Sequence, residues 1–293
     1  MTVVVAEPTL AARAFGGVRS NRLLLGGLVL AALLVLVALF APLMAPHPED
    51  AGFATHPLET LAAPSWSHPF GTDAVGRDLF SRVLYGTRIS LGISAVVILL
   101  SLLVGVPLGL AAGYFGGIVD TVLMRVTDIV LAFPALLFSL ALAAMLGPSI
   151  RNATIAIAAT WWPWYARLAR GQAASVARRQ YVESCRALGL PWPRILFRHV
   201  LPNSLTPVIV QASLDVGGVI LTAAALSFLG LGAQDPTPEW GLMVSQGQEY
   251  FTTQWWLVAF PGAAILIAAV AFNLIGDGLR DAFDPRRVTG RRL

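Results

Sequence analysis

The sequence contains no lysine: all 20 of its basic residues are arginine. This absence excludes a Walker A phosphate-binding loop, which requires a lysine to reach the nucleotide phosphates, and it excludes Schiff-base chemistry. If ATP drives this protein, a partner must therefore bind and hydrolyse it. Cys185 is the single cysteine, so an internal disulfide is excluded as well.

Charged residues are also scarce, at 12% of the 293 residues, whereas 56% are hydrophobic. Such a composition is typical of polytopic membrane proteins. The net charge is +4, but the arginines flank apolar segments instead of forming a soluble basic surface. They indicate cytoplasmic loops, and we expect no nucleic-acid partner.

Six long apolar segments predict an all-α integral membrane protein with six transmembrane helices, because about 20 apolar residues cross the ~30 Å of hydrocarbon. The first segment exceeds the roughly 7–15 residues of a signal-peptide core, so we interpret it as a retained helix. The expected spans are about 23–43, 89–114, 118–146, 152–168, 205–231 and 255–275. The expected regions are a cytoplasmic lead (1–21), the first transmembrane helix (22–46), an extracytoplasmic segment (47–87), a five-helix core (88–280) with a polar loop at 175–202, and a cytoplasmic tail (281–293).

The polar loop has the pattern of a short amphipathic helix. Ala177, Tyr181, Cys185 and Leu188 recur at spacings of four, four and three, which predicts one apolar stripe. Gly189 supplies a residue suited to a left-handed helix end, and the proline that follows forbids continuation.

Two further features suggest that this loop is a docking element. Arg179, Glu183 and Arg186 fall on another helix face at spacings that allow side chains to pair. Pro193 is suited to open a second short helix, which we expect to stop before Pro202. An amphipathic helix lying on anionic lipid is the alternative. The glycine and proline punctuation favours docking onto a soluble partner.

The distribution of arginine predicts the orientation. With both termini inside and six spans, fifteen arginines lie on the cytoplasmic side and four (Arg77, Arg82, Arg88 and Arg151) lie outside. This positive-inside bias places the loop at 175–202 in the cytoplasm.

Ionisable residues inside the predicted spans are candidates for function or for helix pairing. Arg125 and Asp128 are three residues apart, so we expect them to pair on one helix face or to pack against a sister subunit. Pro134 should kink the same helix. Asp215 lies within the fifth span beside small residues (Ser213, Gly217 and Gly218) that would allow close helix approach. We interpret Asp215 either as a polar contact across that interface or as a residue of the translocation path.

The histidines do not predict a metal site. Three of the four lie in the extracytoplasmic segment, at His47, His56 and His68. Their spacing matches no common ligand set, and scattered loop histidines are much more frequent than metal sites. His199 is expected to be a structural residue at a helix end. No arrangement of nucleophile and base is apparent, so we expect no catalytic residue, bound cofactor or metal.

Several motifs resemble the permeases of bacterial ATP-binding-cassette importers. Glu183-Ser184-Cys185, then three residues to Gly189, resembles the E-A-A coupling loop of that family, with two small residues in place of the alanines. The wider resemblance is to the C-type permease subunit of dipeptide, oligopeptide and nickel importers, and it extends over about 22–287. The motifs are HPFGTDAVGRDLFSRVLYGTRISL (68–91), LSFLGLG (226–232), TPEWGLM (237–243) and FNLIGDGLRDAFDPR (272–286).

This resemblance implies the type I importer permease fold in the bacterial inner membrane. It implies a second, similar permease with the path between the two, two cytoplasmic ATPases that use ATP and magnesium, and an extracytoplasmic binding protein. Docking to the ATPase would fall to Tyr181, Glu183, Cys185, Arg186, Ala187, Leu188 and Gly189. Short peptides are the expected substrate, with nickel, glutathione or another small solute left open.

Two other classes of function are weaker. A secondary transporter driven by an ion gradient would require intramembrane relays, for which only Asp128 and Asp215 are available. A membrane-embedded enzyme would require a constellation of catalytic residues that the sequence lacks.

Overall fold

The computed structural model describes residues 22–283, and this part of the chain is helical, with one isolated β-bridge between Thr72 and Asp78 and no strand. The all-α prediction is therefore confirmed. The expected lead at 1–21 and most of the tail, at 284–293, lie outside the described residues. The elements are α2 (Arg22–Met44), η1 (Pro48–Ala51), α3 (Leu79–Phe115), α4 (Gly117–Leu131), α5 (Ala135–Leu146), α6 (Ile150–Ala177), α7 (Gln180–Ala187), α8 (Trp192–Ile195), η2 (Leu196–Val200), α9 (Leu201–Phe228), α10 (Trp240–Gly247), η3 (Gln248–Tyr250) and α11 (Trp256–Phe283).

Four helices within residues 22–283 are long and apolar enough to cross a membrane: α2, α3, the continuous helix 192–228, and α11. The bent pair α4 and α5 provides a fifth candidate. The fourth expected span, at about 152–168, corresponds to α6. Its 28 residues would extend ~42 Å, but Arg151, Arg167 and Arg170 make it less apolar than the others.

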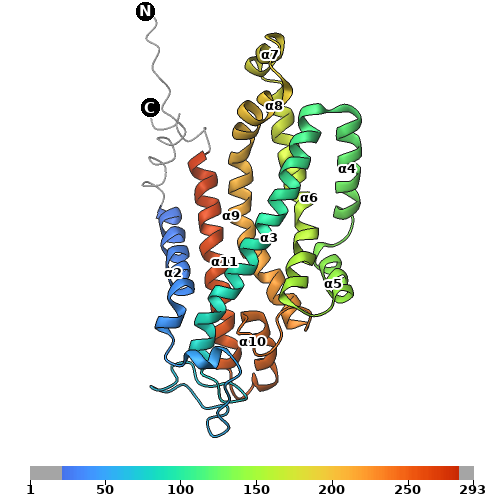
Figure 1. Cartoon of the computed structure of the whole chain (residues 1–293). Helices are drawn as coiled ribbons and strands as arrows, with labels where there is room; N and C mark the ends of the chain where they lie inside the picture. The colour runs from blue at the N-terminus through green and yellow to red at the C-terminus, as the bar shows by residue number, and fades with distance from the viewer. Residues whose placement is uncertain (1–21, 284–293) are drawn as a thin grey trace, which may run out of the picture.

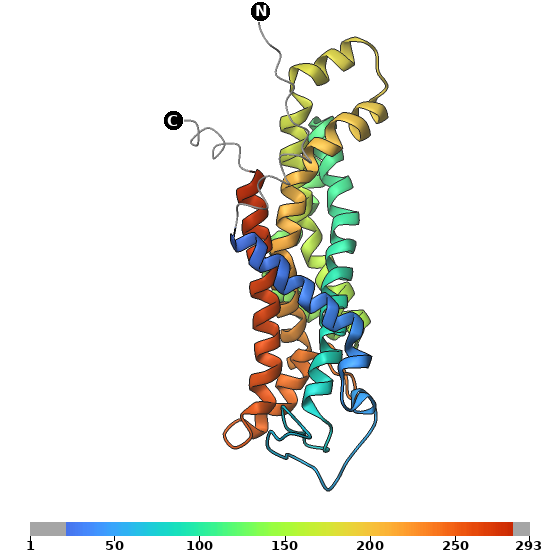
Figure 2. The ribbon, with the colours of Figure 1, turned by 90° about the vertical axis from the view of Figure 1, so that its left-hand side faces the viewer.

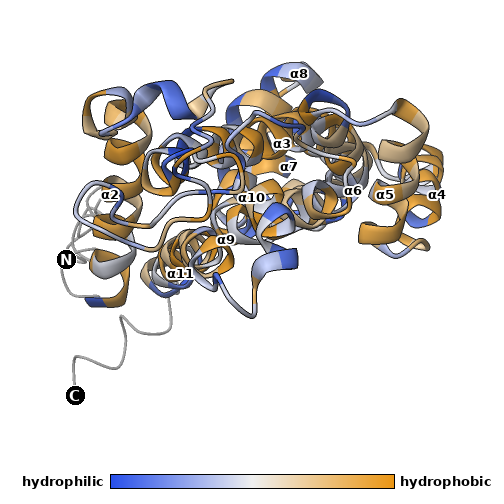
Figure 3. Ribbon diagram, turned by 90° about the horizontal axis from the view of Figure 1, so that it is seen from below, coloured by the Kyte–Doolittle hydropathy of each residue, from blue (hydrophilic) through white to orange (hydrophobic). Residues whose placement is uncertain are grey.

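The long helices form an upright bundle (Figure 1). Helices α7 and α8 project at one end, termed here the α7 end. Helix α10 and the irregular segment 45–78 cover the other, termed the α10 end. Helix α2 crosses obliquely over the bundle (Figure 2). In Figure 3, viewed from the α10 end, α2 lies on one flank and α4 and α5 lie on the opposite flank, with hydrophobic residues on their outer surfaces, as expected for helices that face lipid.

Glycines at a spacing of four residues bring α3 against α6. A Cβ atom on Gly105, Gly109 or Gly113 would lie 2.4, 2.2 or 2.4 Å from a carbonyl oxygen of α6. Only a residue without a side chain allows the two backbones to approach this closely, as in other small-residue membrane interfaces. The close contact fixes α3 and α6 as an interlocked pair.

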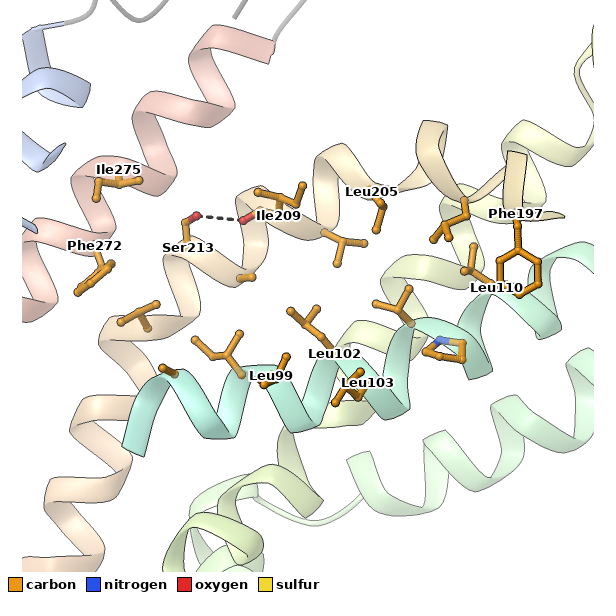
Figure 4. A pocket seen from close by; sticks show the side chains of 18 of the residues that line it. Leu99, Leu102, Leu103, Leu110, Phe197, Leu205, Ile209, Ser213, Phe272 and Ile275 are labelled. Atoms are coloured by element: carbon orange, nitrogen blue, oxygen red, sulfur yellow. Dashed lines mark hydrogen bonds between the residues drawn. The ribbon is translucent and has the colours of Figure 1, made fainter. Parts of the chain in front are cut away.

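The other side of α3 borders an open groove. A cavity of about 700 Å³ opens between parts of α3, α9 and α11, and its lining is almost entirely apolar. Figure 4 shows Leu99 and Leu103 of α3 on one wall, Leu205 and Ile209 of α9 on another, and Phe272 of α11 at one end. Nearer the α10 end α3 and α9 do pack together, through residues such as Val97 and Val219.

Helix α3 begins at Leu79, ten residues before the expected start of the second span. The Asp78 carboxylate caps it by accepting a hydrogen bond from the Ser81 backbone N–H at 2.8 Å. The first turn contains the charged residue Arg82. Its side chain is directed into the protein, where it is 1% exposed. The expected start of the membrane-spanning part of this helix, at about residue 89, stays a prediction.

Both proline predictions concern helix breaks, and they have different outcomes. Pro134 does break the third span: the axes of α4 and α5 differ by 84°, with Pro134 at the N-cap of α5. Pro202 does not stop a helix, so that expectation is wrong. The π-helical turn η2 precedes it, in which the Leu201 N–H donates to the Leu196 carbonyl five residues back. This wider turn lets the helix continue past a residue that has no N–H to donate.

The predicted pairing of Arg125 with Asp128 is wrong. Asp128 accepts instead from Arg167 of α6 at 2.6 Å, and Arg125 is exposed. A second pair joins Arg170 of α6 to Asp120 of α4, with Nε to Oδ1 at 3.0 Å. Spacing along one helix does not reveal a partner on its neighbour, and these acids hold α4 onto α6.

Candidate functional site

The loop at 175–202 forms a helix-turn-helix that projects from the α7 end between α6 and α9 (Figure 1). Gly189 ends α7 in the left-handed conformation, with φ of +75°, as predicted. The Leu190 N–H donates to the Cys185 carbonyl at 3.1 Å and the Gly189 N–H donates to the Arg186 carbonyl at 2.9 Å. These are the two hydrogen bonds of a Schellman motif. Pro193 lies in the first turn of α8, also as predicted.

The sequence predicts one apolar stripe on this element, but in the structure its four residues do not share one environment. Ala177 is buried at the end of α6, and Cys185 is half-buried, whereas Tyr181 and Leu188 are exposed at 40% and 79%. The inward face of α7 is centred on Val182, which is 0% exposed and packs with Ile195 and Leu196. Val182 was missed, although its spacing of three residues from Cys185 places both on one helix face.

The charged face of α7 also differs from its prediction. Within residues 22–283 no ion pair joins Arg179, Glu183 and Arg186, and all three are exposed. The Arg186 guanidinium lies over the Tyr114 ring, 4.9 Å from its centroid, in a cation–π contact. Arg179 and Glu183 are thus left facing outward.

The helix-turn-helix is braced on the end of α3. Besides the contact of Arg186 with Tyr114, the ring of Trp192 in α8 packs edge-on against Phe115, with centroids 5.2 Å apart. Sequence reasoning did not find these aromatic contacts. The sequence signal that could have indicated them is the aromatic pair Tyr114-Phe115, just before Gly116-Gly117. These two contacts join the helix-turn-helix to the end of α3.

The seven residues predicted to contact an ATPase all lie on this projecting element. Cys185 is half-buried. The other six are exposed: Tyr181, Glu183, Arg186, Ala187, Leu188 and Gly189.

Asp215 lies between helices within this chain, away from the helix-turn-helix. Its Oδ1 accepts a hydrogen bond from Gln211 at 2.9 Å, and Tyr165 and Trp161 of α6 lie close to its carboxylate. Neither Asp215 Oδ2 nor the Tyr165 hydroxyl has a well-formed hydrogen bond within the described part of the chain. The expected close helix approach occurs nearby, where a Cβ on Gly217 would lie 3.2 Å from Ala269 of α11.

At the α10 end, carboxylates organise the irregular segment. Buried Asp50 accepts from the Asp78 backbone N–H at 2.7 Å and contacts His56 Nε2 at 2.8 Å. This contact holds the pKa of His56 above its ordinary value. His68 Nδ1 lies 3.0 Å from the Asp78 carboxylate. Two of the loop histidines therefore have carboxylate partners that account for their positions.

Two of the motifs that carried the resemblance, 68–91 and 237–243, meet at this same end. Glu239 is 1% exposed and caps α10 by accepting from the Gly241 and Leu242 backbone N–H groups. The Trp240 indole donates to the Val83 carbonyl at 3.1 Å. A Cβ on Gly86 would lie 2.7 Å from Trp240. Thus the segments 68–91 and 237–243 pack against each other.

Arg77 joins two distant segments of this end. Its guanidinium donates to Asp73 at 2.8 Å and to Asp235 at 2.9 Å. Burial alone would raise the pKa of Asp235, but hydrogen bonds from Arg77 and Gln246 outweigh burial and hold that pKa below its ordinary value. Asp235 is therefore ionised at neutral pH and bound to Arg77.

The fold matches that of a solved transporter. Residues covering 69% of this chain superpose on 97% of a chain from the inward-facing MetNI methionine ABC transporter, with a TM-score of 0.54 and 17% sequence identity. At this identity the match establishes the fold alone. An all-helical membrane bundle with a braced helix-turn-helix at one end is the type I permease fold.

The sequence comparisons define the family. Residues 105–289 match the binding-protein-dependent transport system inner membrane component, and residues 9–64 match the N-terminal TM domain of oligopeptide transport permease C. The chain belongs to the first of these families: it is a permease subunit of an ABC transport system, which implies ATPase and substrate-binding partners.

Relatives named as permeases are similar over most of their length. The dipeptide transport system permease protein DppC of Alkalihalophilus pseudofirmus is 45% identical over 93% of this chain and 89% of its own. The probable D,D-dipeptide transport system permease protein DdpC of Escherichia coli is 49% identical over 88% and 86%. The glutathione transport system permease protein GsiD of Pectobacterium atrosepticum is 42% identical over 87% and 84%.

Proposed function

We propose that this chain is one of two homologous permease subunits that form the translocation path of an ATP-driven importer for short peptides. The observation that carries this proposal is the similarity, at 45% and 49% identity over most of the chain, to permeases named for dipeptides. Glutathione, the substrate named for another relative, is the alternative cargo. The chain itself would be a non-catalytic subunit that leaves ATP hydrolysis to its partners, because it has no lysine for a phosphate loop.

We further propose that the α7 end is cytoplasmic, together with both termini, and that the α10 end faces outward from the bacterial inner membrane. The arginine distribution supports this orientation. An extracytoplasmic binding protein would then deliver the peptide to the α10 end. Two ATPase subunits, which bind ATP and magnesium, would receive α7 and α8.

The exposed side chains of α7 suit a groove on an ATPase. Leu188 and Tyr181 would provide the apolar plug, and Arg179 and Glu183 would provide a charged rim. Movement of the ATPase would pass through the Trp192–Phe115 contact into α3 and, through η2, into α9. Asp215, a carboxylate on α9 within the membrane, would contribute to the path.

The test is ATP-driven uptake of a labelled dipeptide by liposomes that contain the complete complex. Leu188→Glu places a charge on the proposed docking face and should abolish both ATPase co-purification and uptake. Leu58→Glu is the matched control, because Leu58 is fully exposed at the α10 end, and it should leave the ATPase bound. The docking proposal fails if Leu188→Glu transports normally. The proposal of an ATP-driven importer fails if wild-type uptake needs no ATP.

Uptake in competition with unlabelled solutes tests the cargo. An excess of dipeptide should suppress uptake of the labelled dipeptide more strongly than an equal excess of glutathione does. The reverse result would assign the importer to glutathione.

A further inference from the structure

A second cavity, of about 370 Å³, lies at the α10 end, between the start of α3 and the region from α10 to α11. Its volume is within the usual range of small-molecule sites. Unlike the groove beside α3, it is lined by charged groups of both signs. The segment 73–82 contributes Asp73, Arg77 and Arg82, and the segment 235–249 contributes Asp235, Ser245 and Glu249.

Arg82 is the most unusual of these residues, because it is only 1% exposed and incompletely hydrogen-bonded. Its Nη1 donates to the Asp50 carbonyl at 3.1 Å and to the Pro236 carbonyl at 3.3 Å, and its Nε lies 3.6 Å from Asp73. Its Nη2 has no hydrogen-bond partner in the described residues. A buried cationic donor without an acceptor is rare in native proteins, and it points to an acceptor supplied from outside the chain.

Neighbouring Arg77 provides the contrast. It is also buried, at 5% exposed, but Asp73 and Asp235 bind its guanidinium at 2.8 and 2.9 Å. Asp73, the carboxylate that lies 3.6 Å from Arg82 Nε, is thus already engaged by Arg77. Of these two arginines, Arg82 alone has a buried N–H donor without an acceptor among the described residues.

A free negative group also lines this cavity. Glu249 on η3 is exposed, and no ion pair or hydrogen bond engages its carboxylate within residues 22–283. One unpaired donor and one unpaired carboxylate therefore border a single small cavity. This arrangement complements a molecule that carries a carboxylate at one end and an ammonium group at the other.

We propose that this cavity binds a small zwitterion of the short-peptide class, with the peptide carboxylate at Arg82 and its α-ammonium group at Glu249. The inference rests on the proposed function, because it assigns a site on this chain to the peptide that the importer would carry. The location supports it: this end would face the binding protein, so the site would receive peptide as the binding protein releases it.

The test measures peptide binding to the purified complex in nanodiscs, without the binding protein. Isothermal calorimetry would compare dialanine with dialanine amide, which lacks the carboxylate, and with N-acetyl-dialanine, which lacks the ammonium group. A charge-assisted hydrogen bond to a buried donor predicts that the amide binds about 10- to 100-fold more weakly than dialanine. Equal binding of dialanine and its amide would overturn the proposal.

Two variants locate the binding without disturbing Arg82, whose bonds also hold the fold. Glu249→Gln should weaken dialanine and leave N-acetyl-dialanine unchanged. Ala74→Trp, at an exposed position lining the cavity, should abolish binding, whereas Ala63→Trp, exposed but outside the cavity, should not. Normal binding by Ala74→Trp would overturn the assignment of the site.

Failure here is distinguishable from failure of the proposed function. If wild-type complex shows no saturable dialanine binding yet imports the dipeptide with ATP and the binding protein, the pocket proposal falls and the importer stands. If Ala74→Trp binds dialanine normally and loses only the docking of the binding protein, the pocket proposal also falls and the importer stands. If dipeptide is not imported at all, the proposed function falls.

Discussion

The two sides of α3 are packed in opposite ways. Toward α6, three glycines bring the backbones together so closely that no Cβ would fit. Toward α9, a cavity of about 700 Å³ opens along part of the contact between the helices. Both faces are apolar, so hydrophobicity does not distinguish them. In a bilayer, lipid tails are as apolar as leucine, and helix association depends on close packing instead. The difference therefore marks α3 and α6 as one rigid unit, and it gives α9 room to move against them.

The largest expected effect comes from breaking the tight side. Gly109→Leu would place side-chain atoms where a Cβ alone would lie 2.2 Å from the Ala166 carbonyl oxygen. We expect destabilisation of about 3 kcal/mol or more, because a main-chain clash cannot be relieved by a rotamer change. Thermal unfolding in detergent measures it.

Gly92→Leu is the control for that change. Gly92 lies on the same helix and is exposed, and a Cβ at this position would have no atom within 4 Å. This substitution should leave the unfolding temperature unchanged or raise it, since leucine favours helix more than glycine does. Equal loss in both variants would mean that the contact with α6 does not hold the pair together.

Filling the loose side sharpens the comparison. Ala212→Phe would insert a ring into the groove between α9 and α3. Cavity filling should stabilise the protein by about 0.5–2 kcal/mol while reducing transport several-fold, because α9 loses its freedom. Leu221→Phe, at a position on α9 that is 54% exposed and outside the groove, should transport normally. Unchanged transport by Ala212→Phe would show that the groove is not needed for movement.

The smallest effect is expected at a polar contact on the tight side. The Ser101 hydroxyl donates to the Ala158 carbonyl at 3.4 Å, which is long for a hydrogen bond. Ser101→Ala should therefore cost less than ~1 kcal/mol. If its unfolding temperature fell as far as that of Gly109→Leu, hydrogen bonding and not shape would hold α3 to α6.

The sequence predicted those features that depend on neighbouring residues along the chain. The left-handed turn at Gly189 and the break at Pro134 follow from local backbone chemistry. The spacing of Gly105, Gly109 and Gly113 was also visible, but which helix they contact was not.

What could not be predicted depends on contacts between segments distant in sequence. Asp128 pairs with α6 instead of its own helix, and Arg186 stacks on Tyr114 from another helix. The helix passes Pro202 only because the preceding turn widens. For the candidate docking residues, the sequence identified the element correctly, but three-dimensional packing decided that Val182 faces inward and Leu188 outward.

The continuous helix from Trp192 to Phe228 has a consequence at the far end of the molecule. Its 37 residues make a rod ~55 Å long, with the turn at Gly189 next to one tip and the LSFLGLG segment at the other. A tilt of about 5° at the α7 end, transmitted along a rod of this length, would carry the opposite tip through roughly 5 Å, about one helical turn. If α7 docks on an ATPase as proposed, a small rotation there would become a displacement the size of an amino-acid side chain at the α10 end.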